Sequence, residues 1–271
     1  MRAEVDLIVN TFERTYREVL APGVIAGIES ENLRAFTRKV ALINNVESPD
    51  DARQRATALR RLGEIDEFYF VSDRLDSALQ ICGLTCGDLG RIPHYSDCAL
   101  VAVTLDGAPW LLYWDAEVRL RRRYNWVDPA LDFMEEDRRV LAANPTSWRG
   151  EVNWSTLEHR GPFALGWGFS DQVFLCRRAE FARPIYREHC LASLRYPLSH
   201  IAADFEQRVD SYMRRHRRLR ATHVGVTYEH PESEGTTYPV ASLAEALKRR
   251  RNYLIFRLLG KSHITHPCLR V

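Results

Sequence analysis

Long apolar segments are missing from this sequence of 271 residues. No run approaches the roughly 18 to 20 apolar residues that a transmembrane helix needs. The first residues, MRAEVDLIVNTF, hold an apolar stretch that is too short for a signal peptide, and no small-residue cleavage site follows it. We therefore expect a cytoplasmic protein without a membrane span.

A dominant charge is also absent. The 38 basic and 36 acidic residues leave a formal net charge of +2, with a pI near 8.2. This balance argues against binding to nucleic acid through overall charge, so no nucleic-acid partner is expected. Lysine occurs only at Lys39, Lys248 and Lys261, and arginine supplies the other basic residues. We interpret this bias as typical of a GC-rich genome, and hence of a bacterial protein.

Closely paired cysteines are lacking as well. The six cysteines form no C-x-x-C pair, and a chain of this size does not need disulfides to fold. We expect them to be reduced thiols. The apolar fraction of 45% is enough for a sizeable core, and no repeat or low-complexity linker divides the chain. The sequence predicts a single domain over residues 1–271.

Short apolar runs alternate with helical patterns in the first half of the chain. Residues 5–12, 39–46 and 66–73 read as buried strands, and helical stretches separate them. A helix over 96–107, although its valines also permit a strand, precedes a fourth strand within 108–120. Alternating strands and helices predict an α/β fold, with a mostly parallel central sheet and right-handed crossovers.

The second half of the chain shows a weaker pattern. Residues 127–145 predict a helix, and residues 161–181 predict a glycine-rich loop followed by a short helix or strand. Residues 219–231 predict a strand that ends at His230, and residues 239–262 predict a helix with arginine-rich and apolar faces. This half is therefore expected to depart from the regular alternation.

Two acids, Asp115 and Glu117, follow the apolar residues LLYW of the fourth strand. Ligands of open α/β sheets gather at the carboxyl ends of the strands. Side chains alternate along an extended chain, so these two acids are expected to point to one side. Paired carboxylates can hold Mn²⁺ or Mg²⁺, although a D-x-E pair also occurs at ordinary solvated strand ends.

A second candidate site is GWGFSDQ, residues 166–172. Glycines beside Trp167, among them Gly168, let the backbone come close to a ligand. Trp167 offers a flat apolar face of the kind that stacks on sugar rings, and Asp171 is an acid within reach. The alternative is a turn that contains a packed tryptophan.

Two histidines, His223 and His230, lie in the last predicted strand. A neutral imidazole can complete a metal site beside the carboxylates. Seven residues apart, the two lie on opposite faces of a straight strand, so only one is expected to reach a common ion. We favour His230, because it ends the strand and precedes the loop PESEGTTYP, which could close over a bound donor.

Taken in order, these segments resemble a GT-A glycosyltransferase. VDLIVNTFERTYREVL is similar to the first strand of that family, RKVALINNVES and EFYFVSD to its second and third strands, and LLYWDAE to the strand with the D-x-D metal motif. GWGFSDQ is similar to the W-G-x-E-D stretch of inverting galactosyl- and N-acetylgalactosaminyltransferases, with Ser170 in place of the usual Glu. The resemblance covers residues 5 to 175, and reaches residue 230 if the histidine is included.

This resemblance implies a single Rossmann-like GT-A domain. Residues 1–118 would bind the nucleotide sugar, residues 119–240 the acceptor, and residues 241–271 would form a basic amphipathic helix and tail. Asp171 would be the general base, and Mn²⁺ or Mg²⁺ would bind at Asp115, Glu117 and one histidine. The remaining candidates would contact the nucleotide or the substrate, namely Thr11, Glu13, Arg14, Asn45, Asp73, Arg91, Trp114, Trp167 and Gly168.

The implied function is that of a metal-dependent inverting hexosyltransferase. It would move a sugar from a UDP- or GDP-sugar to a saccharide or another hydroxyl acceptor. One alternative is a nucleotidyltransferase of related fold, although NTFERTYRE after the first strand lacks the glycine-rich phosphate loop of such enzymes. A non-catalytic protein that binds nucleotide sugars, or serves as a scaffold, is the other.

The C-terminal helix allows two interpretations. A basic amphipathic helix can lie on an anionic membrane surface. The segment YLIF is apolar all round, which favours packing of the helix onto the domain with its arginines in water. We expect the packed arrangement, with membrane contact as the alternative.

Overall fold

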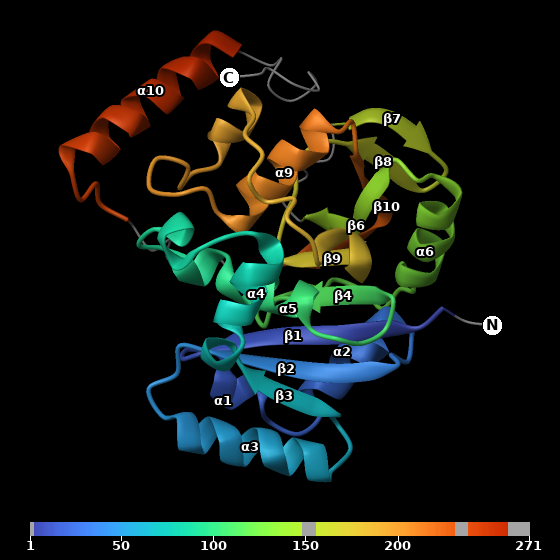
Figure 1. Ribbon diagram of the computed structural model, residues 1–271. Helices are drawn as coiled ribbons and strands as arrows, with labels where there is room; N and C mark the ends of the chain where they lie inside the picture. Colours follow the sequence, from blue (N-terminus) through green and yellow to red (C-terminus); the bar gives the residue numbers. More distant parts are fainter. Residues whose placement is uncertain (1–2, 148–155, 231–237, 260–271) are drawn as a thin grey trace.

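The computed structural model describes residues 3–147, 156–230 and 238–259 of the chain. Within these ranges one sheet of ten strands is flanked by helices, as Figure 1 shows. The strand order is β3-β2-β1-β4-β9-β6-β10-β8-β7, and β5 pairs with β10. The α/β fold expected from the sequence is confirmed.

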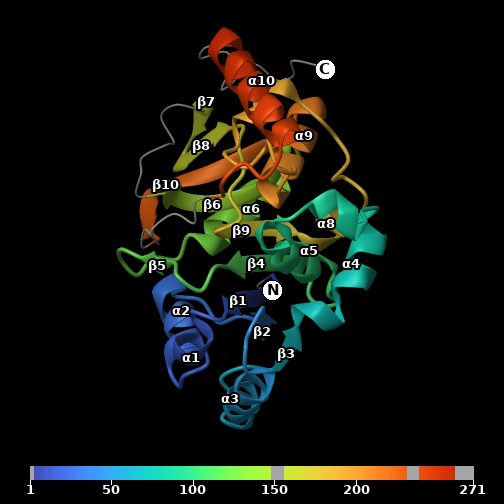
Figure 2. The same ribbon diagram turned by 90° about the vertical axis from the view of Figure 1, so that its left-hand side faces the viewer.

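The N-terminal half contains the predicted parallel strands. β1 (Val5–Phe12), β2 (Arg38–Asn44), β3 (Glu67–Phe70) and β4 (Trp110–Trp114) pair in parallel. The connecting helices are α1 (Tyr16–Val19), α2 (Val24–Asn32), α3 (Pro49–Arg61), α4 (Leu75–Cys82) and α5 (Asp97–Thr104), with short 3₁₀ turns η1 (Val71–Asp73), η2 (Cys86–Leu89) and η3 (Pro93–Tyr95). Figure 2 shows α1 and α2 on one side of these strands, and α4 and α5 on the other.

The order of these four strands creates a switch point. The chain moves outward from β1 to β2 and β3, and then returns to place β4 on the other side of β1. Connections that leave neighbouring strands in opposite directions open a crevice at their carboxyl ends. Here the switch point lies between the ends of β1 and β4, which is where Asp115 follows Trp114.

The C-terminal half of the sheet is mixed. Antiparallel β9 (Val173–Arg177) joins β4 to β6 (Val140–Ser147), which pairs in parallel with β10 (Leu219–Glu229). β8 (Phe163–Gly166), β7 (Thr156–Arg160) and β5 (Arg119–Leu120) extend the sheet by antiparallel pairing. The helices here are α6 (Val127–Glu136), α8 (Arg178–Phe181) and α9 (Phe205–Arg215), with the 3₁₀ turn η4 (Leu191–Arg195).

The helix expected over 127–145 is wrong in its second part. Helix α6 ends at Glu136, and residues 140–147 form strand β6. Pairing with β9 and β10 decides this, because a short apolar run such as VLAA suits either a helix or a buried strand. The short helix or strand expected after the glycine-rich loop is strand β9, followed by α8, whereas residues 163–166 of the expected loop form β8. The strand expected to end at His230 is confirmed as β10, which ends at Glu229.

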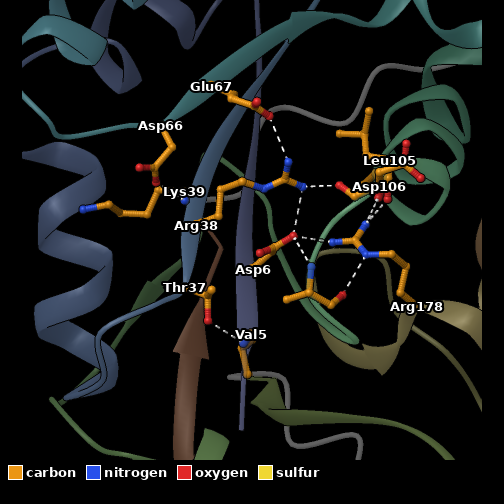
Figure 3. Close-up of polar contacts among 12 residues, drawn as sticks. Val5, Asp6, Thr37, Arg38, Lys39, Asp66, Glu67, Leu105, Asp106 and Arg178 are labelled. Carbon is orange, nitrogen blue, oxygen red and sulfur yellow. Dashed lines mark hydrogen bonds and ion pairs between the residues drawn. The ribbon is translucent and has the colours of Figure 1, made fainter. Parts of the chain in front are cut away.

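A buried charge cluster lies at the amino ends of the parallel strands, opposite the ends that carry Asp115 (Figure 3). Asp6 is 1% exposed, and its Oδ2 accepts hydrogen bonds from Arg38 at 2.9 Å and from Arg178 at 2.7 Å. Arg178 also donates to the carbonyl oxygens of Ala102, Leu105 and Ala108. Buried charges are stable only when they are paired and hydrogen-bonded, and these charges are both. We therefore assign the cluster a structural role.

The predicted C-terminal helix is present as α10 (Leu243–Leu259) and contacts η4. Its expected packing is confirmed only in part, because the apolar segment YLIF stays largely exposed. Tyr253, Leu254 and Phe256 are 57%, 53% and 40% exposed, whereas the buried residue of the helix is the polar Asn252. Tyr253 and Phe256 line a pocket with Leu194, Tyr196 and Pro197 of the domain, so YLIF is partly covered on its inner side. No helix in the described ranges is both long and apolar enough to cross a bilayer.

Candidate metal and substrate site

Asp115 begins a tight turn at the carboxyl end of β4. The backbone N–H of Val118 donates to the Asp115 carbonyl oxygen at 3.1 Å, and the N–H of Glu117 donates to Asp115 Oδ1 at 2.9 Å. The two acids are neighbours because of this turn. The expectation that strand alternation aligns them is wrong in its reason, since the strand ends at Trp114.

Asn10 holds this turn from the neighbouring strand. Its side-chain Nδ2 donates to Asp115 Oδ2 at 3.1 Å, and its Oδ1 accepts from the N–H of Ala116 at 2.8 Å. The sequence interpretation missed this residue. The available signal was a polar side chain near the end of the otherwise apolar run VDLIVNTF.

His230 lies beside the two acids. Its Nε2 is 3.6 Å from Asp115 Oδ1 and 3.7 Å from Glu117 Oε2. Strand pairing explains the proximity, because Glu229 of β10 lies opposite Arg119 of β5, two residues after Glu117. The side chains of Asp115, Glu117 and His230 are 19%, 21% and 19% exposed, so each is both held in place and open to a ligand.

These three side chains fit a divalent cation. Their potential ligand atoms all lie within 4.8 Å of one another. Two carboxylate oxygens suit Mn²⁺ or Mg²⁺, and an imidazole nitrogen favours Mn²⁺ of the two. The remaining coordination positions would be open to water or to phosphate oxygens.

His223 is placed elsewhere. It is 1% exposed, and its ring packs against Tyr124 and Phe163 at centroid distances of 5.1 and 5.2 Å. Its Nδ1 accepts a hydrogen bond from the N–H of Gly225 at 3.1 Å. Burial lowers the pKa of His223. It does not belong to the group formed by Asp115, Glu117 and His230.

Asp171 adjoins the metal-site turn and lies in an acidic environment. The carbonyl oxygen of the next residue, Gln172, accepts from the N–H of Asp115 at 2.7 Å. Burial raises the pKa of Asp171 to about 7, and the nearby charges of Asp204 and Asp115 add to the rise. A carboxyl group with a pKa near neutrality is suited to exchanging protons with a substrate.

Two further acids at the start of α9, its N-cap Asp204 and Glu206, complete this environment, and the sequence interpretation missed both. Glu206 Oε1 accepts from the N–H of Asp171 at 3.1 Å. Asp204 caps the helix, since its Oδ1 accepts from the N–H of Gln207 at 2.7 Å. Burial raises the pKa of Asp204 to about 6, and burial together with the charge of Asp171 raises that of Glu206. The pattern D-x-E before a helical run was the only signal for them in the sequence.

The rest of GWGFSDQ is packed against the body. Trp167 is 6% exposed, and the Arg214 guanidinium lies 5.5 Å from its ring centroid. Gly168 has a φ of 104°, and its N–H donates to the buried Asp210 carboxylate at 2.9 Å. In this structure, therefore, Trp167 and Gly168 shape the loop that carries Asp171, and the tryptophan ring offers little surface for stacking on a sugar.

Some of the residues that were predicted to contact the nucleotide are exposed, and others are held in internal contacts. Asn45 and Asp73 follow β2 and β3 at the same edge of the sheet as Asp115, and both are exposed. Arg14 is also exposed, with its guanidinium 4.0 Å from Glu117 Oε1. A cation beside the metal-site acids is suited to binding a diphosphate. These three side chains are accessible to a ligand.

Three other candidates are engaged in internal contacts. Thr11 is fully buried and shares a hydrogen bond of 3.1 Å with Thr15. Trp114 is fully buried, and its Nε1 donates to the Val118 carbonyl oxygen at 3.1 Å. Glu13 accepts from the N–H of Glu47 at 2.7 Å, and so ties the end of β1 to the loop after β2. These contacts hold the backbone in place around the carboxyl ends of β1, β2 and β4.

Arg91 points toward the start of α10. Its guanidinium donates to both carboxylate oxygens of Glu245 at 3.0 Å, and to the Pro239 carbonyl oxygen at 2.7 Å. It therefore anchors the segment before the helix. The loop PESEGTTYP, which was expected to close over the donor, lies outside the described residues except for its last two positions.

Comparison with known proteins gives similarity only at the level of structure. No family model and no curated protein matches the sequence. A crystal structure of GalNAc-T7 with UDP, GalNAc and Mn²⁺ is 11% identical with a TM-score of 0.46, over 84% of this chain and 44% of that chain. S. aureus TarS is 12% identical with a TM-score of 0.48, over 96% of this chain and 41% of that one.

A third solved structure is similar over most of its own length. Mouse xyloside xylosyltransferase 1, in its apo form, is 13% identical with a TM-score of 0.41, over 82% of this chain and 85% of that chain. This chain thus spans less than half the length of the first two proteins and most of the third. Similarities this distant concern the general course of the chain, and the function has to follow from the site.

Proposed function

We propose that this protein is a metal-dependent glycosyltransferase, which moves a sugar from a nucleotide diphosphate to an acceptor hydroxyl group. The donor would be a UDP- or GDP-sugar, the acceptor a saccharide or another hydroxyl compound, and the reaction a hexosyl transfer. Residues 1–118 would bind mainly the donor, and residues 119–240 mainly the acceptor.

One observation carries this proposal. A carboxylate–carboxylate–imidazole group and a carboxyl group with a pKa near 7 are joined by the hydrogen bond from the Asp115 N–H to the Gln172 carbonyl oxygen. The first group suits a cation that carries a diphosphate. The second suits a general base. A sugar transfer from a nucleotide diphosphate needs both functions close together.

Each of these residues would have a separate role in the transfer. Asp115, Glu117 and His230 would hold a divalent ion, preferably Mn²⁺, which when bound neutralises charge on the leaving diphosphate. Arg14 would contact the same diphosphate. Asp171 would accept the proton of the acceptor hydroxyl as that oxygen attacks the anomeric carbon, on the face opposite the leaving group. Such an attack inverts the anomeric centre.

A panel of nucleotide sugars tests the proposal. The purified protein should release UDP or GDP from one donor when Mn²⁺ is present, and EDTA should remove this activity. Consumption of a nucleoside triphosphate with release of pyrophosphate would instead identify a nucleotidyltransferase. Binding of a nucleotide sugar without turnover, in the presence of every acceptor class tested, would identify a non-catalytic binding protein.

A further inference from the structure

The outer side of α10 carries four exposed leucines. Leu243, Leu247, Leu254 and Leu258 are 77%, 60%, 53% and 85% exposed. An α-helix makes a turn every 3.6 residues or so, and the spacing of these positions places all four on one side of it. We call these four residues the leucine face.

The opposite side of α10 faces the body, where Tyr253 and Phe256 lie near Leu194 and Tyr196, and polar contacts hold the helix in place. Asn252 is 5% exposed, and its Nδ2 donates to Ser199 Oγ at 3.0 Å. Glu245 accepts the two hydrogen bonds from Arg91. Two residues turn a helix by about 200°, so Asn252 points away from Leu254. Figures 1 and 2 both show α10 at the outer end of the molecule, opposite α3.

Arginines border the leucine face. Arg250 and Arg257 are exposed, and the helical rotation places both along one margin of the face. Arg251 is exposed on the other margin, and its guanidinium donates to Asn252 Oδ1 at 3.1 Å. The only acid in α10 is Glu245, on the inner side. A second copy of the chain, packed through the same face, would bring arginines together without acids between them. Lipid phosphates offer the complementary charge.

We propose that α10 docks this protein on an anionic membrane surface, with the leucine face in the acyl boundary and the bordering arginines at the lipid phosphates. At about 1.5 Å per residue, the 17 residues of α10 would lie along the surface for roughly 25 Å. This attachment is independent of the proposed enzymatic function, because its residues lie outside the candidate site.

The segment just before α10 also contacts the body of the protein. Just before α10, the Tyr238 hydroxyl hydrogen-bonds to His94 Nε2 at 2.5 Å, and its ring meets that of Tyr95 at 5.6 Å between centroids.

Flotation of the full-length protein with vesicles tests the docking. The protein should float with phosphatidylglycerol-containing vesicles at low salt, less so at high salt, and not with pure phosphatidylcholine vesicles. Arg250→Gln with Arg257→Gln should weaken partitioning about fivefold for each arginine, so roughly 25-fold together. Leu247→Gln with Leu254→Gln should abolish flotation.

Matched variants elsewhere control for charge and apolar surface. Arg60→Gln with Arg61→Gln removes two exposed arginines from the end of α3, and Leu62→Gln with Leu157→Gln removes two exposed leucines. Both should float like the unchanged protein. The proposal is overturned if the unchanged protein stays soluble at low salt, or if the Leu247/Leu254 variant floats as well. Conversion of a dimer to a monomer by that variant, without any flotation, would assign the face to a second copy.

Discussion

Asn10 holds Asp115 across the junction of β1 and β4, with its Nδ2 3.1 Å from Asp115 Oδ2 and its Oδ1 2.8 Å from the N–H of Ala116. The two residues are 105 positions apart in the chain. One side chain thus orients both the carboxylate and the turn that presents Glu117. Asn10 therefore orients the candidate metal site, although it is not expected to bind the ion itself.

Replacing Asn10 should therefore weaken the site without removing a ligand. Loss of a side chain that orients a metal ligand typically costs about 10- to 100-fold in metal affinity, so we expect a loss of this size for Mn²⁺ in Asn10→Ala. Isothermal titration with Mn²⁺ measures it. Asn45→Ala, at the exposed end of β2, is the control and should leave the affinity unchanged.

The two histidines should behave differently. His230→Ala should weaken Mn²⁺ binding at least about tenfold, because it removes one of three ligands. His223→Ala should leave the affinity unchanged and lower the melting temperature, since His223 is a buried packing residue. His159→Ala, at an exposed position, controls for the loss of an imidazole. Unchanged Mn²⁺ affinity in His230→Ala would exclude that residue from the site.

The pH dependence of turnover should report on Asp171. A base works when deprotonated, so kcat/KM should fall as the pH decreases through the pKa of Asp171, which burial and the charges of Asp204 and Asp115 raise to about 7. Mn²⁺ on Asp115 offsets one of those charges. With Mn²⁺ bound, the fall of kcat/KM at low pH (the acid limb of the pH profile) should therefore be centred below pH 7.

Asp204→Asn provides a sharper test of that assignment. Asparagine can keep the hydrogen bond from the Gln207 N–H and so preserve the helix cap, but it removes a like charge near Asp171. The acid limb should move to lower pH at the same Mn²⁺ concentration. Asp106→Asn, at an exposed position, should not move it. A limb that stays in place in Asp204→Asn would contradict the assignment to Asp171.

Asp171→Asn should separate activity from stability. Loss of a general base should reduce turnover about 100- to 10,000-fold. The folded protein raises the pKa of Asp171, so the ionised group destabilises the fold above that pKa, and the effect disappears below the pKa of the unfolded chain. The variant should therefore melt at a higher temperature than the unchanged protein near pH 8, and the difference should shrink near pH 4. Thermal unfolding at the two pH values measures this.

The buried cluster at the other edge of the sheet should matter for stability alone. Asp6→Ala leaves the Arg178 guanidinium without its carboxylate, and breaking a buried ion pair costs about 3–5 kcal/mol. Glu67→Gln, which removes a partly exposed partner of Arg38, should cost about 0–1 kcal/mol. Urea unfolding gives both values. Any Asp6→Ala protein that folds should bind Mn²⁺ with unchanged affinity.

Residues 5–12, 39–46 and 66–73 were recognisable as strands from the sequence alone, because buried parallel strands consist of short continuous apolar runs. The sequence likewise indicated the pair Asp115 and Glu117, since its position after LLYW follows from local order along the chain. These features depend on neighbours in the sequence. The structure confirms the three strands with the bounds 5–12, 38–44 and 67–70, and residues 71–73 form η1 instead.

The tertiary structure decided what depends on distant pairing. Residues 140–147 became a strand because β9 and β10 lie on either side of them. His230, and not His223, lies beside the acids because β5 fixes the register of the end of β10. Asn10, Asp204 and Glu206 reached the site from strands and helices far along the chain. No local pattern encodes such contacts, because they arise only when the sheet is assembled and its strands are brought into register.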